Sequence, residues 1–181
     1  MRFIYFIFIL FVIIGCKEKP LKRQISKIDL TTDFEELTKK MSDYDTIQLS
    51  MNLSLCVYMG YESHQITKCG DTLFFKGEKT EFVDKKIKYD EVKISVNDTN
   101  LKLDDFLKTN KFRVKNCYDN GARLILKSDT TAIYFFSRGL GNSSNLIVGY
   151  LDMMSKIYPE QQNKREILPP PETEMIDLIG K

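Results

Sequence analysis

The sequence predicts an α+β fold: one domain in which an antiparallel β-sheet of about five to eight strands carries two or three helices on its apolar face. Three observations lead to this prediction. Apolar and polar residues alternate strictly from Thr46 onward, which is typical of a half-buried strand. Short turn signals such as Gly70-Asp71 separate the next apolar runs. Two other segments, around Phe34 and Tyr150, place apolar residues at helical spacing.

Composition and charge exclude several function classes. The chain has 181 residues, of which 43% are hydrophobic and 29% charged, enough for one ordinary core. With 27 Lys and Arg against 25 Asp and Glu, the net charge is only +2. This leaves no excess of basic residues to neutralise the phosphates of a nucleic acid, so no nucleic-acid partner is expected. The single histidine, His64, excludes metal sites built from two or more imidazoles, and neither a metal nor a cofactor is predicted.

The first residues form a targeting segment. Arg2 precedes an unbroken apolar run from Phe3 to Ile14, which is shorter than the roughly 20 residues that a spanning helix needs. At its end, Ile13-Ile14-Gly15-Cys16 resembles the lipobox of bacterial lipoproteins. The resemblance implies a signal peptide over residues 1–15 and a lipidated Cys16. The alternative is an uncleaved N-terminal helix in which Cys16 is an ordinary thiol.

The same resemblance implies a location. Two or more acyl chains on Cys16 would anchor the protein stably at a membrane surface of the cell envelope. Lys17 stands where an inner-membrane retention signal would have Asp, which favours the outer membrane. Residues 16–27 are then a flexible tether, residues 28–159 the α+β domain, and residues 160–181, which contain three consecutive prolines from Pro169, a disordered tail.

The first half of the domain begins with a helix and continues as a meander. Thr32 and Glu35 have capping-box spacing, which predicts a helix over residues 33–42 that buries Phe34, Leu37 and Met41. The alternation predicts a strand over residues 46–59. A turn over residues 60–64 and strands over 65–69 and 72–76 follow, the last two joined at Gly70-Asp71. Short apolar runs predict further strands over 82–83, 86–89 and 92–96.

The second half combines helices and a hairpin. A short helix is predicted from about residue 101 to residue 110, after the capping residues Asp98 to Asn100. The Asn120-Gly121 turn predicts a hairpin between strands over 112–117 and 122–127. A strand over 131–136 follows. The final helix, over 144–158, carries Leu146, Tyr150 and Met154 on one side and is stopped by Pro159.

The cysteines offer one disulfide candidate. Pairing Met59 with Ile66 would place Cys56 directly opposite Cys69, at a separation that a cross-strand bridge can span. Export would permit the bridge. Unpaired thiols are an equally good interpretation, because a slip of one residue in register puts the two side chains on opposite faces. Cys117 would remain as a small buried group.

No motif carries a reaction. His64 is predicted in an exposed hairpin turn, and neither a thiol-histidine pair nor convergent carboxylates is evident in the sequence. We therefore expect a non-catalytic envelope lipoprotein that binds a protein or another envelope component, with an inhibitor or immunity protein as one version. A small envelope hydrolase using His64 or the Asp71 region, and a structural or assembly subunit, are the alternatives. The expected binding face carries Asn52, Ser54, Tyr58, Tyr61 and Thr67.

Overall fold

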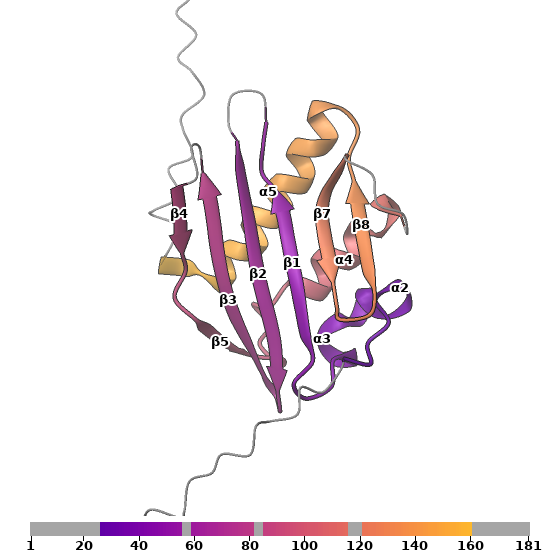
Figure 1. The fold of residues 1–181 in the computed structure, drawn as a ribbon, viewed down its shortest axis with the longest axis vertical. Coiled ribbons are helices and arrows are strands. Elements are labelled where there is room, and N and C mark those ends of the chain that lie inside the picture. Colours follow the sequence, from indigo (N-terminus) through magenta and orange to yellow (C-terminus); the bar gives the residue numbers. More distant parts are fainter. Residues whose placement is uncertain (1–25, 56–58, 82–84, 116–120, 161–181) are drawn as a thin grey trace, which may run out of the picture.

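The computed structural model describes residues 26–55, 59–81, 85–115 and 121–160. They form an α+β domain with an eight-stranded antiparallel sheet of order β4-β3-β2-β1-β7-β8-β6, in which β5 also pairs with β3 (Figure 1). This confirms the predicted fold class. The strands are β1 (Thr46–Asn52), β2 (Gly60–Cys69), β3 (Thr72–Glu81), β4 (Lys85–Lys88), β5 (Val92–Ser95), β6 (Val114–Lys115), β7 (Ala122–Lys127) and β8 (Ala132–Phe136).

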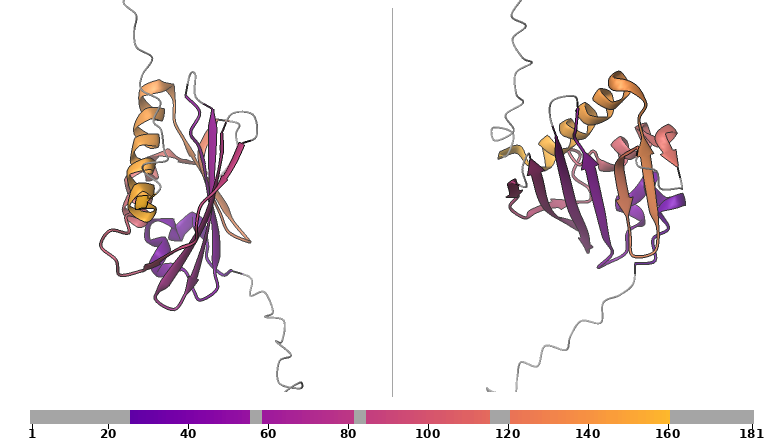
Figure 2. Two further views of the ribbon diagram at one scale, coloured as in Figure 1. Left: turned by 90° about the vertical axis from the view of Figure 1, so that its left-hand side faces the viewer. Right: turned by 45° about the horizontal axis from the view of Figure 1, so that its top comes forward.

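The helices all lie on one face of the sheet, and the opposite face is left open (Figure 2). They are α2 (Leu30–Asp33), the 3-10 turn η1 (Phe34–Glu36), α3 (Leu37–Lys40), α4 (Leu103–Thr109), the 3-10 turn η2 (Lys111–Arg113) and α5 (Gly139–Ile157). None of them, within the described part of the chain, has the length and apolar character needed to cross a membrane.

The core lies between the covered sheet face and the helices. Its sheet side includes Ile47, Leu49 and Met51 of β1, whose alternation with polar residues predicted their burial. Its helix side includes Tyr150 and Met154 of α5, which are fully buried. Burying a large apolar side chain stabilises the fold by about 1.5–3 kcal/mol, so this layer supplies most of the driving force.

The first helical segment begins earlier than predicted. The Asp29 side chain caps α2 by accepting a hydrogen bond from the Thr31 backbone N–H at 3.0 Å, so Asp29 and not Thr32 starts the helix. Short helical turns then continue to Lys40. Phe34 and Leu37 are buried as predicted, because the spacing of apolar residues survives the break into short turns.

The predicted turn over residues 60–64 is wrong. β1 ends at Asn52, the connection to β2 precedes Gly60, and residues 60–64 belong to β2. In the observed register Ile47 pairs with Ile66 and Leu49 with His64. The sequence pattern failed here because two inward positions of β2 are polar, namely Glu62 and His64. The tight turn at Gly70, which has a positive φ of 57°, is present as predicted.

The predicted hairpin between residues 112–117 and 122–127 is also wrong. β7 pairs with β1 on one side and with β8 on the other, so no edge of β7 remains for β6. β6 instead pairs with β8 at the end of the sheet. The last helix starts at Gly139, earlier than predicted, and ends before Pro159. The predictions for residues 82–83, Cys117 and the Asn120 turn position lie outside the described residues.

Candidate functional site

Two polar side chains occupy the core face of β2. Successive strand residues point to opposite faces, so Glu62 and His64 share a face with Ile66, which belongs to the core. Glu62 is 1% exposed and His64 is 0% exposed. Charged or ionisable groups are rarely buried so completely without partners, which makes this pair the natural start of a search for a site.

Three tyrosines surround this pair. The Glu62 carboxylate accepts hydrogen bonds from the Tyr89 hydroxyl at 2.7 Å and from the Tyr150 hydroxyl at 2.9 Å. His64 Nε2 lies 3.4 Å from Glu62 Oε2, and His64 Nδ1 lies 3.5 Å from the Tyr158 hydroxyl. We call these five residues, Glu62, His64, Tyr89, Tyr150 and Tyr158, the buried polar cluster.

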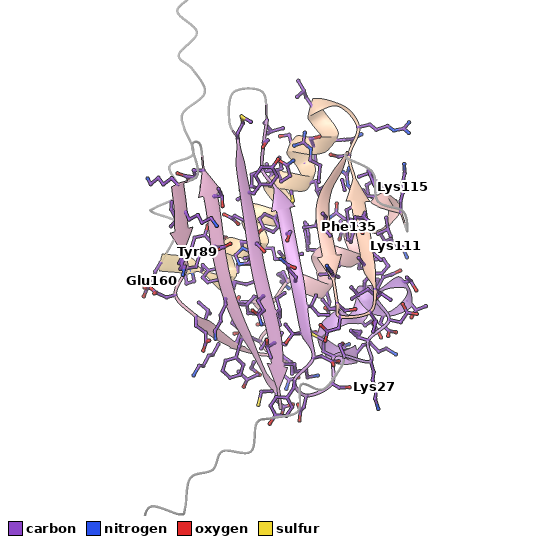
Figure 3. The ribbon with its side chains drawn as sticks, viewed as in Figure 1. Lys27, Tyr89, Lys111, Lys115, Phe135 and Glu160 are labelled. Atoms are coloured by element: carbon purple, nitrogen blue, oxygen red, sulfur yellow. The ribbon has the colours of Figure 1, made fainter. Side chains whose placement is uncertain are left out.

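The cluster joins three regions of the fold. Glu62 and His64 come from β2, Tyr89 follows β4 at the β4 side of the sheet (Figure 3), and Tyr150 belongs to α5, with Tyr158 just after it. The imidazole of His64 stacks on the Tyr89 ring with centroids 5.6 Å apart and an angle of 28° between the planes. Hydrogen bonds and ring contacts together therefore fix the sheet against α5.

Gly77 of β3 makes room for the cluster. It pairs with His64 in the strand register, and a Cβ atom on it would lie 2.3 Å from His64 Nδ1 and 2.8 Å from a carbon of the Tyr89 ring. Its backbone does not have a positive φ, so the requirement for glycine is steric. The rings fill the space that a side chain at position 77 would take.

A buried lysine lies next to the cluster. Lys79 pairs with Glu62 in the strand register and is 7% exposed. Its Nζ is 2.6 Å from Glu81 Oε1. The alternation of β3 turns Lys79 inward, whereas Lys85 and Lys86 of β4 are exposed.

The chemistry open to the cluster is limited by its burial. A carboxylate beside an imidazole is a pairing used in acid-base catalysis, but a reacting group must be able to reach it. Glu62 and His64 line neither of the two surface grooves described below. The arrangement fits a polar core network that orients α5 on the sheet. The prediction of an exposed His64 is wrong, since β2 includes this residue.

Asp71 does not join His64. It lies exposed in the turn after β2, whereas His64 lies in the middle of that strand. The two residues named for a hydrolase are thus not brought together. Within the described ranges, no group of three His, Cys, Asp or Glu side chains could hold a metal ion.

The disulfide prediction is contradicted at Cys69. Its thiol is free and exposed, at the end of β2 that adjoins the Gly70 turn. Cys56 belongs to the connection at the other end of β2 and lies outside the described residues, as does Cys16. The bridge was expected from a pairing of Met59 with Ile66, whereas Ile66 pairs with Ile47.

The predicted binding residues lie on or beside the open face of the sheet. Tyr61 is 55% exposed and accepts a hydrogen bond from the Asn52 amide at 3.4 Å. Thr67 is half-buried and shares a hydrogen bond of 3.1 Å with the Thr46 hydroxyl. Ser54 is half-buried beyond the end of β1, and its hydroxyl accepts a hydrogen bond from the Gly60 backbone N–H at 3.4 Å. Tyr58 lies outside the described residues.

The open face also carries a groove of about 550 Å³ that the sequence did not predict. The strand register brings its polar side chains into rows, with Gln48 beside Gln65 and Lys76, and Ser63 beside Glu78 and Lys88. Lys76 pairs with Glu91 at 2.9 Å. The full lining is Gln48, Ser63, Gln65, Lys76, Gly77, Glu78, Lys88, Tyr89 and Glu91.

Some of these residues could have been found from the sequence. The even positions of β1, including Gln48, were predicted to face outward, and their neighbours on β3 follow once the register is known. The cluster partners Glu62, Tyr89 and Tyr158 were missed, because their meeting depends on a register and a helix position that no local pattern encodes. Comparison with protein-family models, curated proteins and solved structures finds no match for this chain.

Proposed function

We propose that the protein is a lipid-anchored cell-envelope protein that acts as a non-catalytic binding module through the open face of its sheet. Cys16 would carry the lipid and hold the domain at the membrane surface, with the outer membrane the favoured location. The partner would be a protein or another envelope component, and inhibition of a toxin or hydrolase at the cell surface is one form that this role can take.

The observation that carries the binding role is the uncovered sheet face with its groove (Figure 2). A sheet of a compact domain ordinarily exposes a polar face, so exposure alone is ordinary. Here the face is also hollowed and lined by amides, a hydroxyl and balanced charges, two lysines against two glutamates. Such side chains donate and accept hydrogen bonds without favouring a strongly charged ligand.

The binding role is tested by site-specific photocrosslinking of the full chain in its membrane. A photoreactive residue replaces Gln65, which is exposed in the groove, or, as a matched control, Leu140, which is 64% exposed at the start of α5. The proposal expects a discrete crosslinked product from position 65 and none from position 140. Equal products from both positions, or none from position 65, would overturn it.

The lipid anchor at Cys16 is tested separately by feeding cells a radioactive fatty acid. The wild-type chain is expected to incorporate the label, and the Cys16→Ser variant is expected to lose it. Retention of label by the variant would overturn the assignment of the lipid to Cys16 without deciding the binding role, because the crosslinking result does not depend on which residue is acylated.

A further inference from the structure

A second groove, of about 490 Å³, lies between α4 and α5 on the helical side of the domain. Its walls carry Lys102 and Asp105 from the start of α4, Asp152 and Lys156 from α5, and Phe112 and Arg113 from η2. The segment that contains Phe112 and Arg113 is bounded by Lys111 and Lys115, which lie on the β8 side of the molecule, away from Tyr89 (Figure 3). This groove is therefore separate from the buried polar cluster.

Arg113 is the unusual residue of this groove. It is only 9% exposed, yet the single hydrogen bond that its guanidinium donates to a described residue runs from Nε to Asn110 Oδ1 at 3.0 Å. No described residue accepts from its terminal Nη groups, and no described carboxylate forms an ion pair with it. Burial lowers the pKa of the guanidinium. A buried cation without a counter-charge among the described residues is costly, which favours the binding of an anionic partner.

The other charges of the groove are already paired. Lys102 Nζ lies 3.5 Å from Asp105 Oδ2, and Lys156 Nζ lies 2.8 Å from Asp152 Oδ2. These two lysines and two aspartates cancel, so among the described residues that line the groove Arg113 leaves one uncompensated positive charge. The charge balance favours a ligand with a single anionic group.

The rest of the lining is apolar. Phe106 and Met153 are buried beneath the groove at 7% and 1% exposure. The Phe112 ring is 73% exposed, although large aromatic side chains are usually covered, and the guanidinium carbon of Arg113 lies 4.6 Å from its centroid. An aromatic ring beside a guanidinium can contact the apolar part of a ligand whose anionic group meets the arginine.

We propose that this groove binds a ligand in which an oxyanion, carboxylate or phosphate, is attached to an apolar group. The guanidinium of Arg113 holds the oxyanion through its Nη groups, a geometry that suits two parallel hydrogen bonds. Asn110 fixes the guanidinium through Nε, and Phe112 covers the apolar part of the ligand. This site is independent of the open sheet face, and either proposal can fail without the other.

The test follows the arginine side-chain signals of the full chain by nitrogen NMR, with the protein labelled on arginine and dissolved in an uncharged detergent. Benzoate and phenyl phosphate are the two anionic probes, and benzyl alcohol is the neutral control. We expect a saturable shift of the Arg113 signals with at least one anion and none with the alcohol. Saturation by benzoate alone identifies a carboxylate site, and saturation by phenyl phosphate alone identifies a phosphate site.

Variants then assign the binding energy. Arg113→Gln is expected to weaken binding by at least about tenfold, the effect of losing a charged hydrogen-bond partner. Arg138→Gln, at an exposed arginine outside the groove, should leave it unchanged. Phe112→Ala removes an exposed ring, so the variant should still fold. It should weaken the binding of benzoate more than the binding of acetate, because acetate has no ring for Phe112 to cover. The absence of any saturable Arg113 shift in the wild-type protein, or undiminished binding by the folded Arg113→Gln variant, would overturn the proposal.

Discussion

The hydroxyl of Tyr150 on α5 donates a hydrogen bond to Oε2 of Glu62 on β2 at 2.9 Å, between residues 88 apart in the chain. Both side chains are buried in the mainly apolar layer between the sheet and the helices. The apolar stripe of α5 selects the face that meets the sheet, but apolar contacts have no directional preference and leave its exact position open. A directional bond at this point fixes that position.

Replacing Tyr150 with Phe should destabilise the protein by about 1–3 kcal/mol, because the Glu62 carboxylate loses one of its two tyrosine donors in a buried place. The measurement is the free energy of unfolding from urea titration. Tyr44→Phe, which removes the same atom from a residue that is 53% exposed, is the matched control and should change the free energy by less than about 0.5 kcal/mol. Equal effects of the two variants would contradict a special role for the cluster.

Gly77→Ala should destabilise the protein by about 1–3 kcal/mol or more, because the added methyl group would overlap the His64 ring. Combining it with His64→Ala should recover part of the loss, which a double-mutant cycle detects as a coupling energy. Gly141→Ala is the control, since its Cβ meets open space in α5 and helix propensity favours alanine. Strict additivity of the Gly77 and His64 changes would contradict the steric explanation.

Asp104 gives a prediction for pH. Burial raises the pKa of its carboxyl above the ordinary value of 3.8, against the hydrogen bonds that it accepts from Thr38. The folded state therefore binds the proton more tightly than the unfolded state, so this group contributes most to stability below pH 3.8 and loses that contribution as pH rises through the raised pKa.

The free energy of unfolding of the wild type, relative to that of Asp104→Asn, should accordingly decrease as the pH is raised from about 3 to neutrality. Urea titrations at several pH values measure it. Asp90→Asn, at an exposed aspartate, is the matched control and should show a smaller pH-dependent difference. A wild-type advantage that grows with pH would show that the hydrogen bonds from Thr38 outweigh burial.

The exposed thiol of Cys69 should react with iodoacetamide in the native full chain without any reductant. Peptide mass spectrometry reads the modified residue directly. Cys69→Ser should change the free energy of unfolding by less than about 0.5 kcal/mol, because no cross-link is lost. Recovery of a peptide that joins Cys69 to Cys56 by a disulfide would contradict this.

The success and failure of the sequence patterns have one physical origin. Ile47, Leu49 and Met51 were correctly assigned to the core because a half-buried strand shows its period through apolar residues. The same criterion fails at Glu62 and His64, where the inward positions are polar and satisfied by hydrogen bonds from distant tyrosines. The pattern breaks where the buried polar cluster lies, which is where local rules are expected to fail.

The sequence patterns also failed to predict which strands pair with each other. The Asn-Gly signal before β7 is local, whereas the pairing of Gln48 with Lys127 joins strands from opposite ends of the domain and displaces β6. The open face was predicted through outward residues such as Tyr61, but its groove needs β3 and β4 in register beside β2. The burial of the Arg113 guanidinium depends on how its segment packs beside α4 and α5, which apolar periodicity does not specify.

The place of β7 between β1 and β8 has a consequence for biogenesis. The N-terminal part of the chain emerges first on export, so β1, β2 and β3 can associate before β7, but the second edge of β1 must wait until Lys127 has followed. During that interval the partial sheet presents unpaired backbone groups next to an apolar surface, a template for wrong association. A chaperone that shields β1 until β7 arrives would protect the chain at its most vulnerable stage.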